Sequence, residues 1–145
     1  MTTRVALDTS ALMMPVELDV RLFDELDRLL TGPPSIDAPD ADGPETADGF
    51  EVITPQPVLE ELRRLSEKGG TEGTAATVGH DLATERCLPV DTAESYADDA
   101  LVELAREGGV DYVVTNDRPL RERVLETGVP VIALRGRNKL QITQP

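Results

Sequence analysis

VALDTSAL, at residues 5–12, and VVTNDRPL, at residues 113–120, are the stretches that decide the fold expected for this chain. In each, a short apolar run leads to an aspartate, Asp8 or Asp117, and a helix pattern follows. Short apolar runs of this kind are typical of buried parallel strands. Because ligands of an open parallel sheet bind at the carboxyl ends of its strands, both aspartates are expected at the rim where a site forms.

Strand and helix patterns alternate along the rest of the chain. This alternation predicts an α/β fold, a single domain over residues 1–145 with a central parallel β-sheet flanked by helices on both faces. Thr9 or Ser10 is expected to cap the helix after Asp8. We predict strands at 4–7, 50–54, 88–90, 112–115 and 129–134, and helices at 16–30, from 55 to the glycines at 69–70, 73–86, 95–106 and 119–126.

Two segments fall outside this alternation. Residues 31–49 form an acidic loop rich in Pro and Gly, which we interpret as a tolerated insertion rather than a loop that flanks substrate. Residues 135–145 form a polar, basic C-terminal tail.

The net charge of −14 and the scarcity of lysine, present only as Lys68 and Lys139, favour a protein of a halophilic archaeon that works in concentrated salt. Such salt screens the repulsion between carboxylates, with a Debye length of about 3 Å at 1 M. The charge repels nucleic acid at low salt, but it permits a nucleic-acid substrate where metal and local arginines meet the phosphates. With no Trp and only two Phe and two Tyr, the chain does not fit single-strand binding on aromatic platforms.

Cys87 and His80 are each alone in the sequence. A disulfide within the chain and a metal or nucleophile site built on Cys or His are therefore not expected. No apolar segment approaches the ~20 residues that a membrane span requires, so we expect a cytoplasmic protein without a membrane partner.

Two further acidic motifs lie at the starts of helix patterns. VLEEL, at residues 58–62, offers Glu60 or Glu61, and Glu61 is favoured because it lies beside the apolar stripe. YADDALVELA, at residues 96–105, offers Asp98, which is expected to share the inward face of the helix, with Asp99 as a possible second ligand. Each acid alone also has a structural interpretation, as a helix cap, a first-turn charge or, for Glu60 and Glu61, a surface glutamate.

Together, Asp8, Glu61, Asp98 and Asp117 are predicted on one rim of the sheet. Carboxylates gathered there repel one another unless a cation joins them, and hard oxygen ligands favour Mg²⁺ or Mn²⁺. Paired metals make a water nucleophilic and stabilise charge on a phosphoryl group. The simplest interpretation is a metal-dependent phosphodiesterase site.

Hydroxyl, amide and guanidinium groups near these acids are candidates for holding substrate. Basic residues concentrate between positions 118 and 139, where a solvated helix face is the alternative interpretation. The predicted substrate-binding residues are Ser10, Thr115, Asn116, Arg118, Arg135 and Arg137.

These four motifs resemble those of PIN-domain ribonucleases, and the similarity covers nearly the whole chain. The stretches 95–105, 113–124 and 129–140 resemble most the PIN subgroup that processes small-subunit ribosomal RNA in archaea and eukaryotes; VapC-type toxins are more distant. The resemblance implies a PIN-like domain with Mg²⁺- or Mn²⁺-dependent endoribonuclease activity in rRNA processing or RNA turnover. It implies catalytic and metal-binding roles for Asp8, Glu61, Asp98 and Asp117, an RNA substrate, cleavage that leaves a 5′-phosphate, and a possible homodimer.

Other classes fit less well. A phosphoacceptor receiver needs paired acids after the first strand, a DxD phosphatase needs an acid where Ser10 stands, and a dinucleotide fold needs a Gly-rich turn. The remaining alternatives are a catalytically weak PIN module that binds RNA or acts in assembly, and a VapC-type toxin, which alone would require an antitoxin partner.

Overall fold

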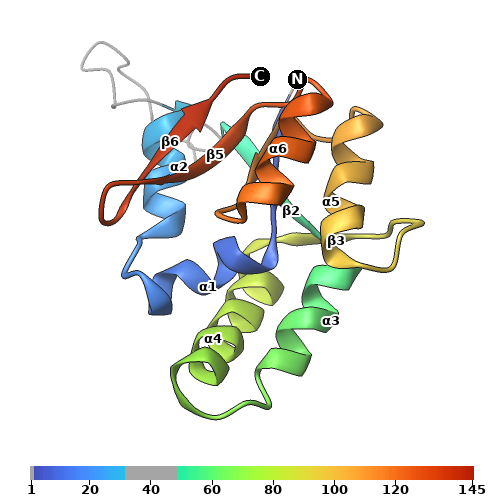
Figure 1. Ribbon diagram of the computed structural model, residues 1–145. Coiled ribbons are helices and arrows are strands. Elements are labelled where there is room, and N and C mark those ends of the chain that lie inside the picture. The colour runs from blue at the N-terminus through green and yellow to red at the C-terminus, as the bar shows by residue number, and fades with distance from the viewer. Residues whose placement is uncertain (1, 32–48) are drawn as a thin grey trace.

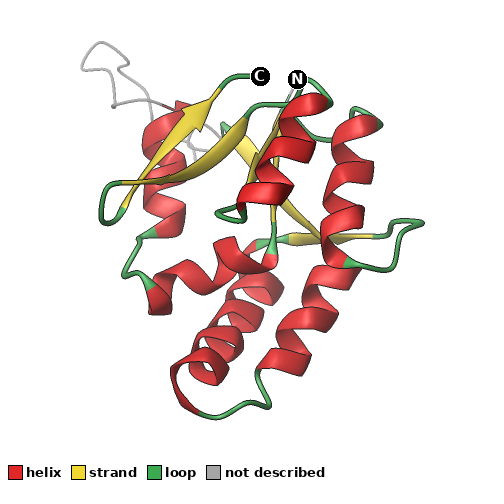
Figure 2. Cartoon of the chain, in the orientation of Figure 1, coloured by secondary structure: helices red, strands yellow, loops and turns green. Residues whose placement is uncertain are grey.

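The computed structural model describes residues 2–31 and 49–145 (Figure 1). Of the acidic loop predicted at 31–49, residues 32–48 lie outside the described residues. Strands and helices alternate as the motifs predict, apart from a doubled first helix and an added last strand (Figure 2). The elements in chain order are β1 (Thr3–Leu7), α1 (Thr9–Glu17), α2 (Leu22–Thr31), β2 (Phe50–Pro55), α3 (Gln56–Leu65), α4 (Gly70–Arg86), β3 (Leu88–Val90), α5 (Ala97–Arg106), β4 (Tyr112–Val114), α6 (Arg118–Glu126), β5 (Val131–Arg135) and β6 (Lys139–Thr143).

The sheet has the strand order β3-β2-β1-β4-β5-β6, and β1 to β5 are parallel. The chain builds outward from β1 on one side through β2 and β3, and then returns to the other side of β1 with β4. The point where the order reverses therefore lies between β1 and β4. In open α/β sheets a ligand binds at this switch point, at the carboxyl ends of the strands. Asp8 follows β1 there, and Asp117 lies three residues after β4.

Helices cover both faces of the sheet. Figure 1 shows α6 in front of β1 and α2 behind β5 and β6, while α1, α3 and α4 gather beyond the carboxyl ends of the strands. The central strands are apolar because both faces are covered: Val5, Leu7, Val113 and Ile132 are fully buried. None of the described helices is long and apolar enough to cross a membrane.

Close packing of α4 on α1 fixes the helix that begins after Asp8. A methyl group on Gly79 of α4 would stand 2.7 Å from the carbonyl oxygen of Leu12 in α1. Only glycine allows this approach, since real Cβ atoms do not come so close to oxygen. The orientation of α1 at the rim therefore depends on a packing contact that local sequence pattern does not reveal.

The single helix predicted at 16–30 is wrong, because the segment forms the end of α1 and most of α2. The chain turns between them, where Asp19 adopts a left-handed conformation with φ of 55°. Aspartate tolerates this region better than most residues. The apolar spacing still identified the inward face, since Val20 and Leu26 are buried and Phe23 packs against the core.

The prediction that 129–134 is the last strand is also wrong. The tail forms β6, which pairs antiparallel with β5, with Leu140 opposite Leu134 and Ile142 opposite Ile132. The sheet is therefore mixed rather than wholly parallel. Leu140 is buried, so the apolar pair in the tail marks an edge strand that the excess of basic and polar residues concealed.

An ion pair on α2 closes the outer edge of β6. The carboxylate of Glu25 accepts a hydrogen bond of 2.9 Å from the Leu140 N–H, and Arg28 donates one of 2.8 Å to the Leu140 carbonyl. Arg28 also pairs with Glu25 at 2.7 Å and, through this hydrogen bond, lowers the pKa of that carboxyl. Unpaired strand edges invite association with other chains, so this pair protects the sheet.

Replacing Glu25 by Ala is expected to destabilise the protein by about 1–3 kcal/mol, because it leaves the buried Leu140 N–H without an acceptor. Glu72→Ala is the matched control: it removes the exposed Lys68–Glu72 pair and should cost less than about 1 kcal/mol. Urea unfolding of the two variants measures the difference. Equal losses would show that Glu25 does not hold β6.

Candidate active site

Asp8 lies at the floor of the candidate site, where β1 passes into α1. Its side chain is 3% exposed and caps α1 by accepting a hydrogen bond of 2.7 Å from the Ala11 N–H. The capping role expected for Thr9 or Ser10 is therefore wrong. Ser10 instead donates its hydroxyl to both carboxylate oxygens of Asp8, at 2.8 and 3.0 Å, and Thr115 donates to one of them.

Burial raises the pKa of Asp8 from 3.8 to about 7. The hydrogen bonds from Thr115, Ala11 and Ser10 lower this pKa, since they stabilise the charged form, and the negative charge of Asp98 raises it again. Removal from water outweighs three donors, so near neutral pH this carboxyl is poised between its charged and neutral forms. A cation beside it favours the charged form.

Glu61 faces the same corner from the middle of α3. It is half-buried, and its Oε1 accepts a hydrogen bond from the Thr9 hydroxyl, 52 residues earlier in the chain. Glu60 is exposed. The preference for Glu61 over Glu60 drawn from the apolar stripe agrees with this placement.

Asp98 and Asp99 are adjacent in the first turn of α5, but they have different interaction partners. Asp99 pairs with Arg123 of α6 at 2.9 Å. Asp98 makes no ion pair within the described residues, and it is solvent-exposed, so the inward placement expected for it is wrong. Partial burial, followed by the negative charges of Asp117 and Glu61, still raises the pKa of Asp98.

Asp117 caps α6 through one of its carboxylate oxygens, which accepts a hydrogen bond of 3.0 Å from the Leu120 N–H. Its own N–H donates to the Thr115 hydroxyl at 3.0 Å. No hydrogen bond engages the other carboxylate oxygen among the residues that the structure describes. Asp117 therefore keeps a free oxygen beside the charge of Asp98.

Three of the predicted substrate-binding residues serve as braces in this structure. Thr115 is fully buried, so its contact is with Asp8 rather than with the surface. Ser10 accepts the N–H of Asn116 at 3.1 Å, and the Asn116 side chain accepts the N–H of Leu134 at 2.9 Å. These bonds tie the ends of β4 and β5 to the start of α1.

The other three, Arg118, Arg135 and Arg137, are exposed and form none of the ion pairs found among the described residues. Arg118 directly follows Asp117, Arg135 is the last residue of β5, and Arg137 lies in the turn between β5 and β6. They are free to meet phosphates, whereas Arg123 is engaged by Asp99.

The four acids interact electrostatically but do not form a compact cluster. Asp98 affects the pKa of Asp8, and Asp117 and Glu61 affect that of Asp98. Within residues 2–31 and 49–145, however, no three His, Cys, Asp or Glu side chains stand close enough for a ready-made metal-binding group. Like charges repel, so separation is the expected arrangement of these carboxylates without a cation.

Thr9 was predicted only as a possible helix cap and not as a residue of the site. The structure brings Thr9 to Glu61 across two elements. No local pattern signals this contact, because it depends on how α3 packs beside the start of α1.

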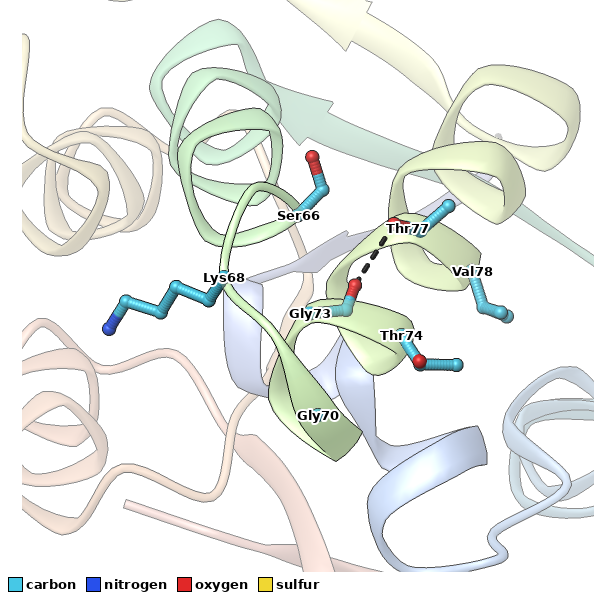
Figure 3. A pocket seen from close by; sticks show the side chains of 7 residues that line it. All are labelled: Ser66, Lys68, Gly70, Gly73, Thr74, Thr77 and Val78. Carbon is cyan, nitrogen blue, oxygen red and sulfur yellow. Dashed lines mark hydrogen bonds between the residues drawn. The ribbon is translucent and has the colours of Figure 1, made fainter.

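A pocket of about 280 Å³ lies elsewhere, at the turn between α3 and α4 (Figure 3). Its lining includes Lys68, Thr74 and Thr77, and the Thr77 hydroxyl donates to the Gly73 carbonyl at 2.9 Å. None of the four acids lines it. In Figure 1 this turn is at the end of the helices that points away from the sheet, so the pocket is separate from the candidate site.

Comparisons with known proteins agree on one family. A family model described as a PIN like domain matches residues 5–42 and 44–137. Ribonuclease VapC4 of Methanocaldococcus jannaschii is 33% identical over 95 residues, which make up 64% of this chain and 72% of that protein. The solved structure of the PIN domain endonuclease Utp24 has the same fold, with a TM-score of 0.70 at 20% identity, over 98% of this chain and 92% of that one.

Proposed function

Because this chain belongs to the family of PIN-like domains, we propose that it is a metal-dependent endoribonuclease that hydrolyses RNA phosphodiesters. The observation that carries the proposal is the electrostatic link among the four acids: Asp98 raises the pKa of Asp8, and Asp117 and Glu61 raise the pKa of Asp98. The name of the relative Ribonuclease VapC4 supports RNA as the substrate. The motif resemblance supports a role in rRNA processing or RNA turnover.

The donor set fits Mg²⁺ or Mn²⁺. Oxygen ligands suit both ions, and Mg²⁺ takes only one or two carboxylates while it keeps several waters. Burial and neighbouring negative charge raise the pKa of both Asp8 and Asp98, which marks a place where positive charge is favoured. Asp8, Asp98 and Asp117 would hold the metal, with Glu61 helping directly or through water. When bound, the ion would make a water nucleophilic and offset charge on the phosphoryl group.

The chain's own residues orient the acids for this chemistry. Ser10, Thr115 and the Ala11 N–H hold the Asp8 carboxylate, and Thr9 holds Glu61. Fixed carboxylates need little reorganisation when charge develops on the substrate. Arg118, Arg135 and Arg137 are free to position phosphates near the rim.

The direct test is cleavage of structured and single-stranded RNA in multimolar KCl with Mn²⁺, since the composition predicts a protein that works in concentrated salt. We expect cleavage that EDTA abolishes, with products carrying a 5′-phosphate and a 3′-hydroxyl because water is the nucleophile. Products ending in a cyclic phosphate, or cleavage that resists EDTA, would contradict a metal-dependent mechanism.

Glu61→Gln is expected to lower the cleavage rate by about 10-fold or more, because it removes a negative charge from the site. Glu60→Gln is the matched control, since Glu60 is exposed and lies on the adjacent position of the same helix. Rates for both variants would be measured at saturating Mn²⁺. A larger loss for Glu60→Gln would reverse the assignment.

A VapC-type toxin is the second candidate, and the 33% identity to Ribonuclease VapC4 favours it. As a toxin the chain would bind an antitoxin partner. A gene for a small antitoxin beside this one would favour that role over general RNA processing.

If wild type binds Mn²⁺ and RNA without cleaving any, a non-catalytic assembly module becomes the better description.

A further inference from the structure

Tyr96 is the most exposed of the large apolar side chains that the structure describes, at 75%. The other three aromatic residues, Phe23, Phe50 and Tyr112, pack against the core. The Tyr96 hydroxyl makes no hydrogen bond with any described residue. Within residues 2–31 and 49–145, this exposed ring therefore lacks the apolar contact that burial would provide.

The place of Tyr96 in the fold is next to the candidate site. It is the N-cap residue of α5, whose first turn carries Asp98, and it follows β3 at the carboxyl-end rim of the sheet. In Figure 1 the connection from β3 to α5 ends where α5 approaches α3, the helix that bears Glu61. Tyr96 therefore begins the helix that carries Asp98, two residues before that aspartate.

The connection before Tyr96 is braced. Both carboxylate oxygens of Glu103, two turns along α5, accept backbone hydrogen bonds from it: 2.9 Å from the Ala93 N–H and 2.8 Å from the Glu94 N–H. The Thr92 hydroxyl also donates to the Glu94 carbonyl at 2.9 Å. The loop is therefore clamped to its own helix, and the backbone of Tyr96 is set before any ligand binds. Such pre-organisation lowers the entropic cost of a contact.

We propose that Tyr96 stacks on an unpaired base next to the scissile phosphate and so selects single-stranded positions in RNA. This inference rests on the proposed ribonuclease function. A stacked base needs only an exposed π face, and it gains affinity without charge. That matters in a chain of net charge −14, because phosphate contacts are opposed by the surrounding carboxylates and are weakened by concentrated salt.

A protein partner fits the surroundings less well. Asp91, Glu94 and Ser95, which precede Tyr96 in the loop, are polar and exposed. Protein interfaces bury a desolvated apolar centre. The low aromatic content argues against an extended stacking platform, but a single stacking position needs only this one ring.

The composition offers a direct probe of the contact. The chain has no Trp and two Tyr, so in a Tyr112→Phe background Tyr96 is the only Tyr or Trp fluorophore. Three ligands of equal length would be titrated without divalent metal: single-stranded RNA, the same RNA as a duplex, and an abasic ribose-phosphate oligomer. We expect single-stranded RNA to quench the fluorescence strongly, and the duplex and the abasic oligomer to leave it nearly unchanged.

Affinity gives an independent readout. Tyr96→Leu is expected to weaken single-strand binding by about 5- to 150-fold, the range for one base–aromatic stack, at both low and multimolar KCl. Tyr96→Phe and Tyr96→Trp should retain the affinity. Leu88→Ala is the matched control, because Leu88 is 50% exposed and precedes the same loop, and it should change nothing.

The outcomes separate the two proposals. Metal-dependent cleavage by wild type with unaltered affinity of Tyr96→Leu would overturn the stacking role alone. Quenching that depends on protein concentration and not on RNA would assign Tyr96 to a protein interface. It would likewise overturn the stacking role. Failure of wild type to bind or cleave any RNA would overturn both the ribonuclease function and the role of Tyr96.

Discussion

Asp98→Asn is expected to lower the rate of RNA cleavage by about 10²- to 10³-fold or more while the protein remains folded. Asp98 is solvent-exposed and makes no ion pair among the described residues. The partial burial that it retains, and the negative charges of Asp117 and Glu61, raise the pKa of its carboxyl. Its carboxylate therefore serves no structural contact that a neutral amide would break. The loss should appear in kcat/KM at saturating Mn²⁺, with the thermal unfolding curve of the metal-free protein little changed.

Asp99→Asn is the control that makes this test sharp. The two residues are adjacent and share a helix turn, but the Asp99 carboxylate is held by Arg123 at 2.9 Å. An exposed pair of this kind contributes about 0–1 kcal/mol, so Asp99→Asn should retain most of the activity. If Asp99→Asn abolished cleavage and Asp98→Asn did not, the assignment of the central acid would be wrong.

Asp8→Asn is expected to stabilise the metal-free protein at pH 8 and to remove much of its pH dependence. Burial raises the pKa of Asp8 from 3.8 to about 7 in the folded state. Below pH 3.8 the carboxyl is neutral in both states, and between 3.8 and 7 the folded state keeps a proton that the unfolded chain releases. Stability is therefore lost as the pH rises through this window.

The size of this effect follows from the same pKa values. A rise from 3.8 to about 7 corresponds to a ceiling of about 4 kcal/mol, and each 1 kcal/mol moves the Tm of a chain of this length by about 2–4 °C. Thermal melts in EDTA from pH 4 to 8 would compare wild type with Asp8→Asn. The curves should lie closest near pH 4, separate as the pH rises towards 7, and keep a nearly constant gap above it; parallel curves over the whole range would contradict the ionisation of a buried Asp8.

Adding Mn²⁺ should narrow the stability gap between Asp8→Asn and wild type. A ligand that binds only the folded state stabilises it by about 2.7 kcal/mol at 100 times its dissociation constant. Wild type is expected to gain this at pH 8 and less at pH 6, where a proton competes for Asp8. Asp8→Asn should gain little at either pH.

Much of the fold could be predicted from the sequence because its signals are local. Each apolar run followed by an acid or a turn residue marked a strand and its carboxyl end, and the parallel pairs confirm those strands. The family match confirms the resemblance to PIN domains that the motifs indicated. The errors fell where local preference is weak, at the left-handed Asp19 between α1 and α2, and in β6, whose pairing depends on Glu25 and Arg28 of α2.

The sequence by itself determined that Asp8 and Asp117 come to one rim, because each follows a strand and parallel strands present their carboxyl ends together. Only the tertiary structure decided how the acids differ in burial, hydrogen bonding and ion pairing. Asp8 is enclosed by hydroxyls from Ser10 and Thr115, the latter 107 residues away, while Arg123 engages Asp99 and leaves Asp98 free. Burial and charge are sums over neighbours from distant elements, so no stretch of sequence carries them.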